Sequence, residues 1–330
     1  MNSSAGISAE MSDVLVTPKC YATIRGTIRA LKAQTVHDRL ELVIVAPSKQ
    51  VVRGVEQEEQ MFHSIRVVEF GEVQTLAAPR AVGIRAATAP LVAIGEDHAF
   101  PDPGWAEALI KAHRQPWAAV GPAFLNGNPG LLSWISLVMD YGRWINPAAE
   151  GVTDDVPGHN SAWKRELLLE YGPKLERTMQ APTILHWDLQ AKGHRLYLEP
   201  AAKVSHFNIS LLTPYLLDHF YGAWMFAGVR SAEWSWTRRI FYVVSSPVLI
   251  VRKLREWLGH IRRAGLAAEL FPRAWPLLLV SAVTNGLGEA VGYCVGLGET
   301  EHRVFNYDAR RGHYFAQRDR NLFFADGDSY

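Results

Sequence analysis

The chain has 330 residues, 48% of them hydrophobic and 20% charged, which is the composition of a globular protein large enough for one α/β domain with an appendage. A formal net charge of +1 excludes the overall positive field of a nucleic-acid-binding protein, so no nucleic-acid partner is expected. Two distant cysteines, Cys20 and Cys294, exclude a disulfide framework and favour a reducing compartment. The polar start MNSSAGISAEMSD lacks the basic and apolar regions of a secretory signal.

The first half of the chain alternates short apolar strands with amphipathic helices. We predict strands at residues 13–17, 41–47, 64–70, 90–95 and 117–121, and helices at 22–34, 78–89 and 104–113. This alternation predicts an α/β fold, a mainly parallel sheet flanked by helices. In such a sheet the ligand sits beyond the carboxyl ends of the strands, and residues 95–98 fall at such an end.

The remaining segments predict how the chain is organised. Residues 124–147 predict turns and then an apolar helix, and residues 157–172 predict a tight loop that leads into a helix. A helix closed by Gly193 follows, then a strand, a turn at Pro200 and a last strand that ends near His206. We expect a disordered N-terminus over 1–11, a core domain over 12–207, a helical extension over 208–298 and a polar, loosely ordered tail over 299–330.

Two acids and an imidazole, Glu96, Asp97 and His98, stand together where the strand at 90–95 ends. Oxygen ligands suit both Mg²⁺ and Mn²⁺, and Mn²⁺ also accepts imidazole. The triplet therefore predicts a divalent metal site, which would neutralise the charge of a diphosphate leaving group. The alternative is a solvated turn whose carboxylates cap the next helix.

The order of these segments resembles a family 2 glycosyltransferase with the GT-A fold, over about residues 12–207. The segments that carry the resemblance are VLVTPKCYATIRGTIRALKAQT, ELVIVAPS, PRAVG, GEDHAFPDPGW, GHNSAWKREL and the closing set Gly193, Arg195, Pro200, Ala202, Val204 and His206. The turn PDPGW matches the family pattern letter for letter. The resemblance implies an inverting, hexosyltransferase-like transfer from a nucleotide-diphosphate sugar to a hydroxyl, assisted by Mn²⁺ or Mg²⁺.

The resemblance also implies roles for individual residues. It places Glu96, His98 and His206 on the metal, Pro18, Arg80 and Asp97 at the donor diphosphate, and His159 and Asn160 in the acceptor loop. A guanidinium such as that of Arg80 matches phosphate geometry. Plainer interpretations remain open: a solvated helix arginine, a hydrogen-bonded turn at 159–160 and a packing role for His206.

The sequence departs from the family pattern at several positions. His98 stands where the family has a second acid, which removes a negative charge and predicts either weaker metal binding or a preference for Mn²⁺. Ala46 and Pro47 replace acids that meet the nucleotide, so the base is not indicated. The position of the family's general base falls near Pro182, and the nearest acids are Glu176 and Asp188. A surface role for either acid is the alternative.

The C-terminal third is rich in arginine, tryptophan and apolar residues. The apolar run between Arg239 and Arg252 is too short to span a bilayer, and the run over 274–298 is interrupted by Asn285 and Glu289. These features favour an interfacial or re-entrant hairpin on the cytoplasmic side of the cell membrane, with a lipid-linked or envelope-glycan acceptor. A helical hairpin packed on the core domain or on a partner subunit is the alternative, so homo-oligomerisation stays open.

Two function classes follow from these features. The first is an active glycosyltransferase. The second is a non-catalytic relative that binds a nucleotide sugar or scaffolds a membrane complex, because the metal triplet is altered and the expected base is missing. A dinucleotide-dependent oxidoreductase is disfavoured, since Pro18 and Lys19 stand where a glycine-rich turn would follow the first strand.

Overall fold

A computed structural model describes residues 8–324, so most of the predicted disordered N-terminus lies outside the described residues. The described chain divides into two units, one of residues 8–123 and 149–205 and the other of residues 124–148 and 206–324. Strands β6 and β9 cross from one range into the other before they end, and each belongs to the sheet over its whole length.

The first unit is built on one mixed sheet. Its strands, in chain order, are β1 (Met11–Val16), β2 (Leu40–Ala46), β3 (Ser64–Glu69), β4 (Leu91–Ile94), β5 (Ala99–Pro101), β6 (Ala119–Asn126), β7 (Gly151–Thr153), β8 (Ala162–Lys164) and β9 (Leu196–His206). The strand order is β3-β2-β1-β4-β8-β6-β9-β5, and β7 pairs with β9. Strands β3, β2, β1 and β4 are mutually parallel, whereas β8 runs antiparallel to β4 and β6.

The predicted α/β fold with helices around a sheet is confirmed, and its parallel part is the four strands β3, β2, β1 and β4. Three strands escaped prediction, namely β5, β7 and β8. Each has three residues, which is too short to show a two-residue alternation of apolar and polar side chains. Only the sheet reveals them, because a strand of this length is defined by its partners.

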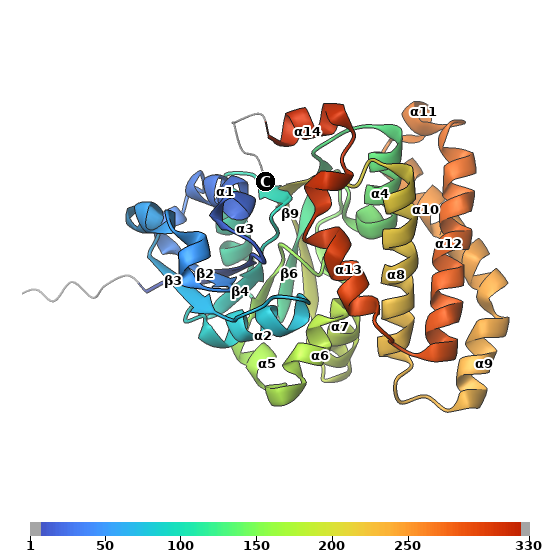
Figure 1. Ribbon diagram of the computed structural model, residues 1–330, viewed down its shortest axis with the longest axis horizontal. Coiled ribbons are helices and arrows are strands. Elements are labelled where there is room, and N and C mark those ends of the chain that lie inside the picture. The colour runs from blue at the N-terminus through green and yellow to red at the C-terminus, as the bar shows by residue number, and fades with distance from the viewer. Residues whose placement is uncertain (1–7, 325–330) are drawn as a thin grey trace, which may run out of the picture. The chain divides into compact units, whose positions relative to one another are not determined.

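Helices cover both faces of the sheet. They are α1 (Tyr21–Lys32), α2 (Ala77–Ala86), α3 (Trp105–Ala112), α5 (Arg165–Leu169), α6 (Leu175–Met179) and α7 (Pro182–Ala191). Figure 1 shows α1 and α3 on one side of the sheet and α2, α5, α6 and α7 on the other. The core on the second side contains Val14, Ile94, Trp163 and Leu185, all buried, and each such side chain contributes roughly 1.5–3 kcal/mol of burial free energy.

Two turn predictions near the end of the sheet have different outcomes. Gly193 follows α7 with φ +89°, so it is the left-handed residue that closes the helix, as predicted. The predicted turn at Pro200 is wrong, because β9 runs unbroken from Leu196 to His206. The neighbouring Ala201 N–H donates to the side chain of Glu199 at 3.0 Å. Proline is tolerated in a strand where its missing N–H is not needed by the sheet.

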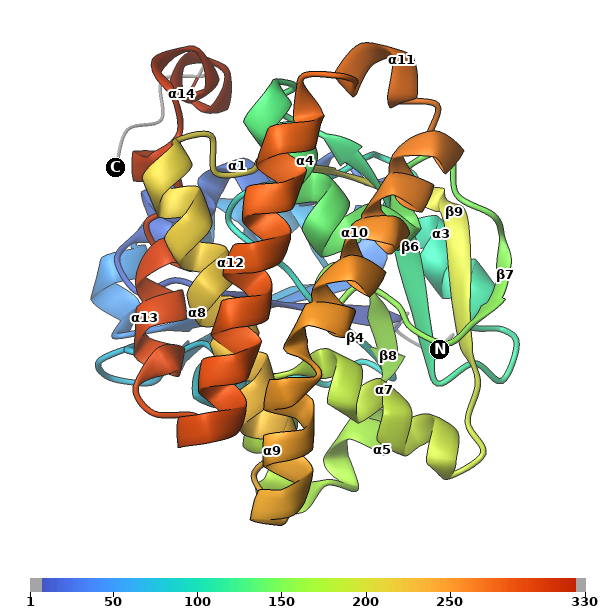
Figure 2. The same ribbon diagram turned by 90° about the vertical axis from the view of Figure 1, so that its right-hand side faces the viewer.

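The second unit is helical. Its helices are α4 (Leu131–Tyr141), α8 (Leu212–Arg230), α9 (Trp236–Val244), α10 (Ser246–Arg263), α11 (Ala267–Leu270), α12 (Ala274–Val295), α13 (Thr300–Asp308) and α14 (Gln317–Phe323). Figure 2 shows α8, α12 and α10 lying side by side. Glycines bring α8 and α12 together: a Cβ on Gly288 would lie 2.3 Å from the carbonyl oxygen of Phe220, and one on Gly292 would lie 2.4 Å from that of Trp224.

The two polar residues that interrupt α12 face protein. The Lys253 ammonium of α10 donates to Asn285 Oδ1 and to the carboxylate of Glu289. Glu289 also accepts a hydrogen bond from the hydroxyl of Tyr293. A buried carboxylate needs such partners, since a charge without them is costly away from water.

By length and composition, α12 is the one helix in residues 8–324 that could cross a membrane. The core helix of a water-soluble protein meets the same criterion, and 44% of the most apolar window of α12 is buried inside the protein. This observation therefore gives weak support to a membrane-directed extension.

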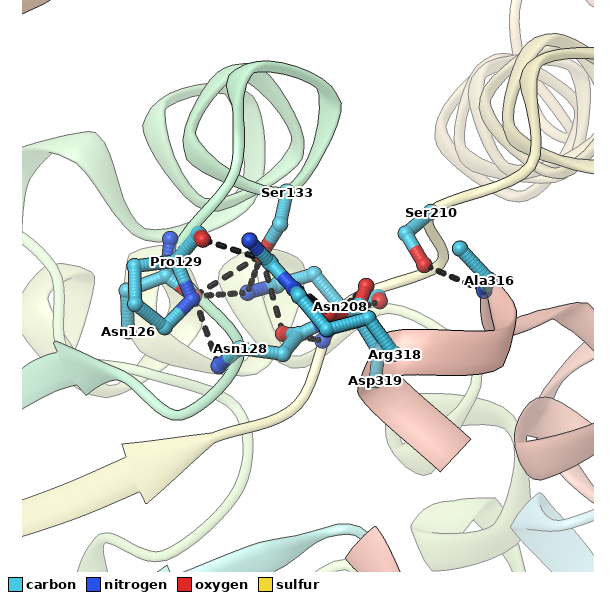
Figure 3. A network of polar contacts seen from close by, with 9 residues as sticks. All are labelled: Asn126, Asn128, Pro129, Ser133, Asn208, Ser210, Ala316, Arg318 and Asp319. Carbon is cyan, nitrogen blue, oxygen red and sulfur yellow. Dashed lines mark hydrogen bonds and ion pairs between the residues drawn. The ribbon is translucent and has the colours of Figure 1, made fainter. Parts of the chain in front are cut away.

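The C-terminal segment is ordered as far as residue 324, so the prediction of a loosely ordered tail is wrong for 299–324. Figure 3 shows the polar network that fixes it. Asn128 and Asn208 exchange two hydrogen bonds of 2.8 Å, and Asn128 also donates to Asp319 at 3.2 Å. The guanidinium of Arg318 donates to the carbonyl of Pro129 at 2.6 Å. This network holds the segment together with apolar contacts, since Phe315 is 1% exposed and its ring packs against those of Phe207 and Phe323.

Candidate metal and donor site

The triplet Glu96-Asp97-His98 follows the end of β4, in the connection to β5. Gly95 is required before it, because a Cβ there would lie 2.4 Å from Cδ2 of Leu15 and 2.6 Å from Oδ1 of Asp13. The chain therefore passes directly over β1 as it leaves the sheet. This close approach places the triplet at the carboxyl ends of the parallel strands, where the sequence predicted a ligand.

Glu96 is buried and is held by three residues from two other segments, helix α1 and the loop at 159–160. Its backbone carbonyl accepts from the hydroxyl of Thr27 on α1 at 2.6 Å. Its carboxylate lies 2.9 Å from Nδ1 of His159 and accepts from Nδ2 of Asn160 at 3.2 Å. The loop predicted to shape the acceptor side thus reaches the residue predicted to hold the metal.

Asn160 connects Glu96 to the loop and to the neighbouring strand and helix. Its φ of 58° is the one positive value at a non-glycine residue in the described chain, and asparagine tolerates that conformation better than most residues. Its N–H donates to the carbonyl of Ile94 at 2.8 Å, and its own carbonyl accepts from the indole of Trp105 at 2.9 Å. The fully buried tryptophan of the PDPGW turn therefore anchors the loop that supports Glu96.

Asp97 and His98 form a pair of their own. Oδ1 of Asp97 lies 2.7 Å from Nδ1 of His98, and Nε2 of the same ring lies 3.7 Å from Oε1 of Glu96. A hydrogen bond to a carboxylate through Nδ1 orients the ring and leaves Nε2 as the nitrogen that could bind a metal. Asp97 therefore orients His98, and the donor contact that the family resemblance implied for Asp97 stays a prediction.

His206 is the last residue of β9. Its Nδ1 lies 2.9 Å from Oδ1 of Asn208, which again leaves Nε2 as the ligand nitrogen. One ligand atom from each of Glu96, His98 and His206 lies within 4.8 Å of the other two, and all three residues are buried. The residues predicted as metal ligands are thus close enough to share one ion.

This donor set fits a divalent cation. One carboxylate and two imidazoles with pre-set tautomers are ligands that Mn²⁺ accepts, whereas Mg²⁺ prefers oxygen alone. Glu96, His98 and His206 are therefore a candidate divalent-cation site.

The predicted donor residues lie on elements around the parallel strands. Pro18 follows β1, where the hydroxyl of Thr17 bonds with that of Thr23 at 2.8 Å and shapes the turn into α1. Arg80 is buried on α2, which begins at Ala77. Their contacts with a diphosphate stay predictions.

The two predicted general bases have more solvent-exposed surroundings than the buried residues of the Glu96 cluster. Asp188 on α7 accepts from Tyr171 at 2.5 Å and pairs with Lys192 at 2.7 Å, and these hydrogen bonds lower the pKa of Asp188. Glu176 on α6 is exposed. Pro182, where the family holds its base, starts α7, and a Cβ on Gly158 would lie 2.8 Å from its ring.

A buried pair beside the acceptor loop was not predicted from the sequence. Oδ1 of Asp155 lies 2.5 Å from Nδ1 of His186, and the indole of Trp163 donates to Nε2 of His186 at 3.3 Å. The hydroxyl of Thr183 donates to Asp155 at 3.3 Å. The pair ties the base of the loop to α7, and no local sequence signal joins an aspartate in a loop to a histidine on a later helix.

A second buried acid lies beneath the site. Asp13 in β1 is 1% exposed, and burial raises the pKa of its carboxyl to about 7. Its place within a strand-like apolar run gave no reason to single it out.

Among the comparisons with known proteins, a family model matches part of this chain. Residues 14–172 match the family described as Glycosyl transferase family 2. A search of curated proteins found no match. The matched residues include Pro18, Arg80, the Glu96 triplet and the 159–160 loop, whereas Glu176, Asp188 and His206 lie beyond them.

Three solved structures are similar in outline. GalNAc-T7 with UDP, GalNAc and Mn²⁺ is 13% identical with a TM-score of 0.44, over 60% of this chain and 43% of its own, so this chain spans less than half of that protein. Staphylococcus aureus TarS 1–349 is 14% identical with a TM-score of 0.44, and its complex with UDP is 13% identical with a TM-score of 0.43. Both TarS matches cover 86% of this chain and 91% of the other.

Proposed function

Because the chain contains a family 2 glycosyltransferase domain over residues 14–172, we propose that it transfers a hexosyl group with inversion from a nucleotide-diphosphate donor to a hydroxyl acceptor. The observation that carries this proposal is the Glu96 cluster. In this cluster, a buried carboxylate and two imidazoles lie at the carboxyl ends of the parallel strands of a family 2 domain. Such ends are where an open α/β sheet binds its ligand.

The chain's own residues have separable tasks in this reaction. A divalent ion held by Glu96, His98 and His206 would stabilise the charge of the nucleoside diphosphate as it leaves. Asp97 keeps His98 in the tautomer that can bind an ion, and Asn160 and His159 hold the Glu96 carboxylate in place. Arg80 and the turn at Pro18 would contact the diphosphate.

The displacement needs a carboxylate that accepts the proton of the acceptor hydroxyl while the sugar–phosphate bond breaks and the new glycosidic bond forms. Asp188 and Glu176 are the candidates that the sequence offers. The lowered pKa of Asp188 makes it a weak base at neutral pH. The structure adds Asp155, which lies in the segment that leads into the acceptor loop and is paired with His186.

We further propose a lipid-linked or envelope-glycan acceptor and a place on the cytoplasmic side of the cell membrane. The support is the arginine- and tryptophan-rich composition of residues 234–298 and the apolar helix α12. A homo-oligomer is compatible with this proposal and is not required by it.

Donor hydrolysis tests the proposal without knowledge of the acceptor. Purified protein is incubated with a panel of nucleotide sugars and either Mn²⁺ or Mg²⁺, and release of the nucleoside diphosphate is measured. We expect turnover with Mn²⁺ for the wild type, loss of turnover in His98→Ala, and no change in His63→Ala, where the histidine is exposed. Full turnover by His98→Ala would show that His98 is not needed to bind the metal.

The non-catalytic alternative makes a different prediction in calorimetry. A nucleoside diphosphate that binds only with Mn²⁺, while no donor is turned over on any acceptor, would favour a nucleotide-sugar-binding or scaffolding protein. If a donor is turned over instead, Asp155→Asn, Glu176→Gln and Asp188→Asn separate the three base candidates, because only the true base lowers turnover without weakening donor binding.

A further inference from the structure

Helices α9 and α10 expose large apolar side chains to solvent. On α9, Trp236, Ile240, Phe241 and Val244 are between 58% and 73% exposed, and the helix has no buried residue. At the start of α10, Val248 is 70% exposed and Val251 is 49% exposed. Single exposed apolar residues are ordinary, but a group of this size marks an interaction surface.

Helix α12 extends the same kind of surface. Leu279, Val283 and Leu287 recur every four residues and are all exposed, so they share one face of the helix. The polar residues Asn285 and Glu289 point instead to Lys253 of α10. The exposed face of α12 is therefore apolar along its length, which is about 30 Å for a helix of this size.

The three helices form one surface. Residues of α12 contact both α9 and α10, and α9 contacts α10. Figure 2 shows α9 and α10 following one another alongside α12. We call the exposed apolar residues of α9, α10 and α12 the apolar face.

Positive charge surrounds the apolar face. Between Trp234 and Gly298 the chain has eight lysines and arginines and three glutamates. Two of those glutamates are paired, Glu256 with Arg143 at 2.7 Å and Glu289 with Lys253. Arg238, Arg252, Arg255 and Arg262 are exposed. The surface thus joins an apolar face to arginines that anionic groups can neutralise.

We propose that the apolar face docks in the plane of an anionic bilayer, with its apolar side chains at the boundary of headgroups and acyl chains and its arginines on lipid phosphates. A second copy of the chain fits less well, since a two-fold contact would bring the arginines of both faces together. A spanning arrangement of α12 also fits less well, because α8 and α10 cover part of it and Lys253 and Glu289 lie on its covered side.

This inference rests on the membrane location proposed above and is independent of sugar transfer. Full-length protein is sedimented with phosphatidylcholine vesicles, with and without phosphatidylglycerol. We expect strong binding only to the anionic vesicles. The double variant Phe241→Glu, Val244→Glu should bind at least ten-fold more weakly. Val152→Glu is the matched control, because Val152 is 60% exposed on β7, and it should bind like the wild type.

Substitutions of the exposed arginines test the electrostatic part of the proposal. Arg252→Gln and Arg255→Gln should each weaken binding to the anionic vesicles by about five-fold and leave binding to neutral vesicles unchanged. Circular dichroism and thermal unfolding confirm that each variant is folded, which is expected because the substituted side chains are exposed.

Three outcomes would overturn the proposal. They are equal binding by the α9 double variant and the wild type, a dimer in sedimentation that the double variant abolishes, and resistance of bound protein to alkaline extraction, which would indicate insertion. Nucleotide-sugar hydrolysis is measured on the same samples. A variant that loses vesicle binding but keeps hydrolysis tests only the role of the apolar face. Protein that binds vesicles but hydrolyses no donor contradicts only the proposed activity.

Discussion

Nδ1 of His159 lies 2.9 Å from Oε1 of Glu96, so a residue of the predicted acceptor loop contacts the carboxylate that is predicted to bind the metal. The contact couples two segments that are far apart in the chain. It makes the position of Glu96 depend on how the 157–160 loop is held.

We therefore expect His159→Ala to weaken Mn²⁺ binding by about ten-fold or more, because groups that orient a metal ligand contribute 10–100-fold to affinity. Titration calorimetry with Mn²⁺ alone measures this effect. His63→Ala is the control. Unchanged affinity in His159→Ala would show that the contact does not position Glu96.

Substitutions of Asn160 separate its side-chain bond from its backbone conformation. Asn160→Gly keeps the φ of 58° accessible and loses the bond to Glu96, which costs about 2 kcal/mol of unfolding free energy. Asn160→Ala loses the same bond and adds about 1 kcal/mol of left-handed strain. Urea unfolding compares the two variants. Equal stability would mean that the backbone conformation relaxes.

Asp97 should act on the metal through His98. Asp97→Ala removes the group that holds Nδ1 of His98, so Mn²⁺ affinity should fall by about 10–100-fold. Asp97→Asn keeps an oxygen at Nδ1 and should lose less. Manganese titration followed by electron paramagnetic resonance ranks the two variants. An asparagine variant weaker than the alanine variant would contradict the orienting role.

The buried carboxyl of Asp13 predicts a pH dependence of stability. Its pKa is about 7 in the folded chain against 3.8 for an unperturbed aspartate. The folded state binds the proton more tightly, so this contribution to stability is complete below pH 3.8 and is lost as the pH rises through 7. The loss is on the order of 4 kcal/mol.

Asp13→Asn should therefore reduce the fall in unfolding free energy between pH 4 and pH 8. Urea unfolding at several pH values measures the slope for both proteins. The amide keeps nearly the same shape as the carboxyl, which makes it the matched replacement. Identical slopes would mean that water or a counter-charge reaches Asp13.

Glycines in α12 should differ according to what they touch. A Cβ on Gly286 would meet Cγ1 of the Ile250 side chain at 2.4 Å, so that side chain would have to shift, whereas one on Gly288 would meet the carbonyl oxygen of Phe220 at 2.3 Å and would require the backbone to move. We expect Gly286→Ala to cost about 1 kcal/mol and Gly288→Ala to cost about 3 kcal/mol. Thermal unfolding tests the order, and the reverse order would show that α8 and α12 separate more easily than Ile250 moves.

Local patterns were sufficient to predict much of the parallel part of this fold. Several apolar residues recur at a regular spacing in the strands at 41–47 and 64–70 and in the helix at 22–34. Residues close in the sequence are therefore enough to predict whether each segment is a strand or a helix. The glycine that closes α7 is also a local signal, because only the residue after the helix has to adopt a positive φ.

Short and polar elements were not predictable in this way. Strand β8 has three residues and exists because β4 and β6 pair with it on both sides. The tail over 299–324 looked loosely ordered because its own composition is polar, and its order comes from partners such as Asn128 that are distant in the chain.

Residue types and motifs alone establish which kinds of chemistry are present: a carboxylate and imidazoles at a strand end, a turn that matches a glycosyltransferase family, and an apolar C-terminal helix with basic flanks. The packing of the whole chain settled which of these groups meet. It assigned Asp97 to orient His98, Asn160 to hold Glu96, and Lys253 to neutralise Glu289. The reason is physical: residue type and spacing set local conformation, whereas hydrogen bonds and ion pairs between distant segments depend on how the whole chain packs.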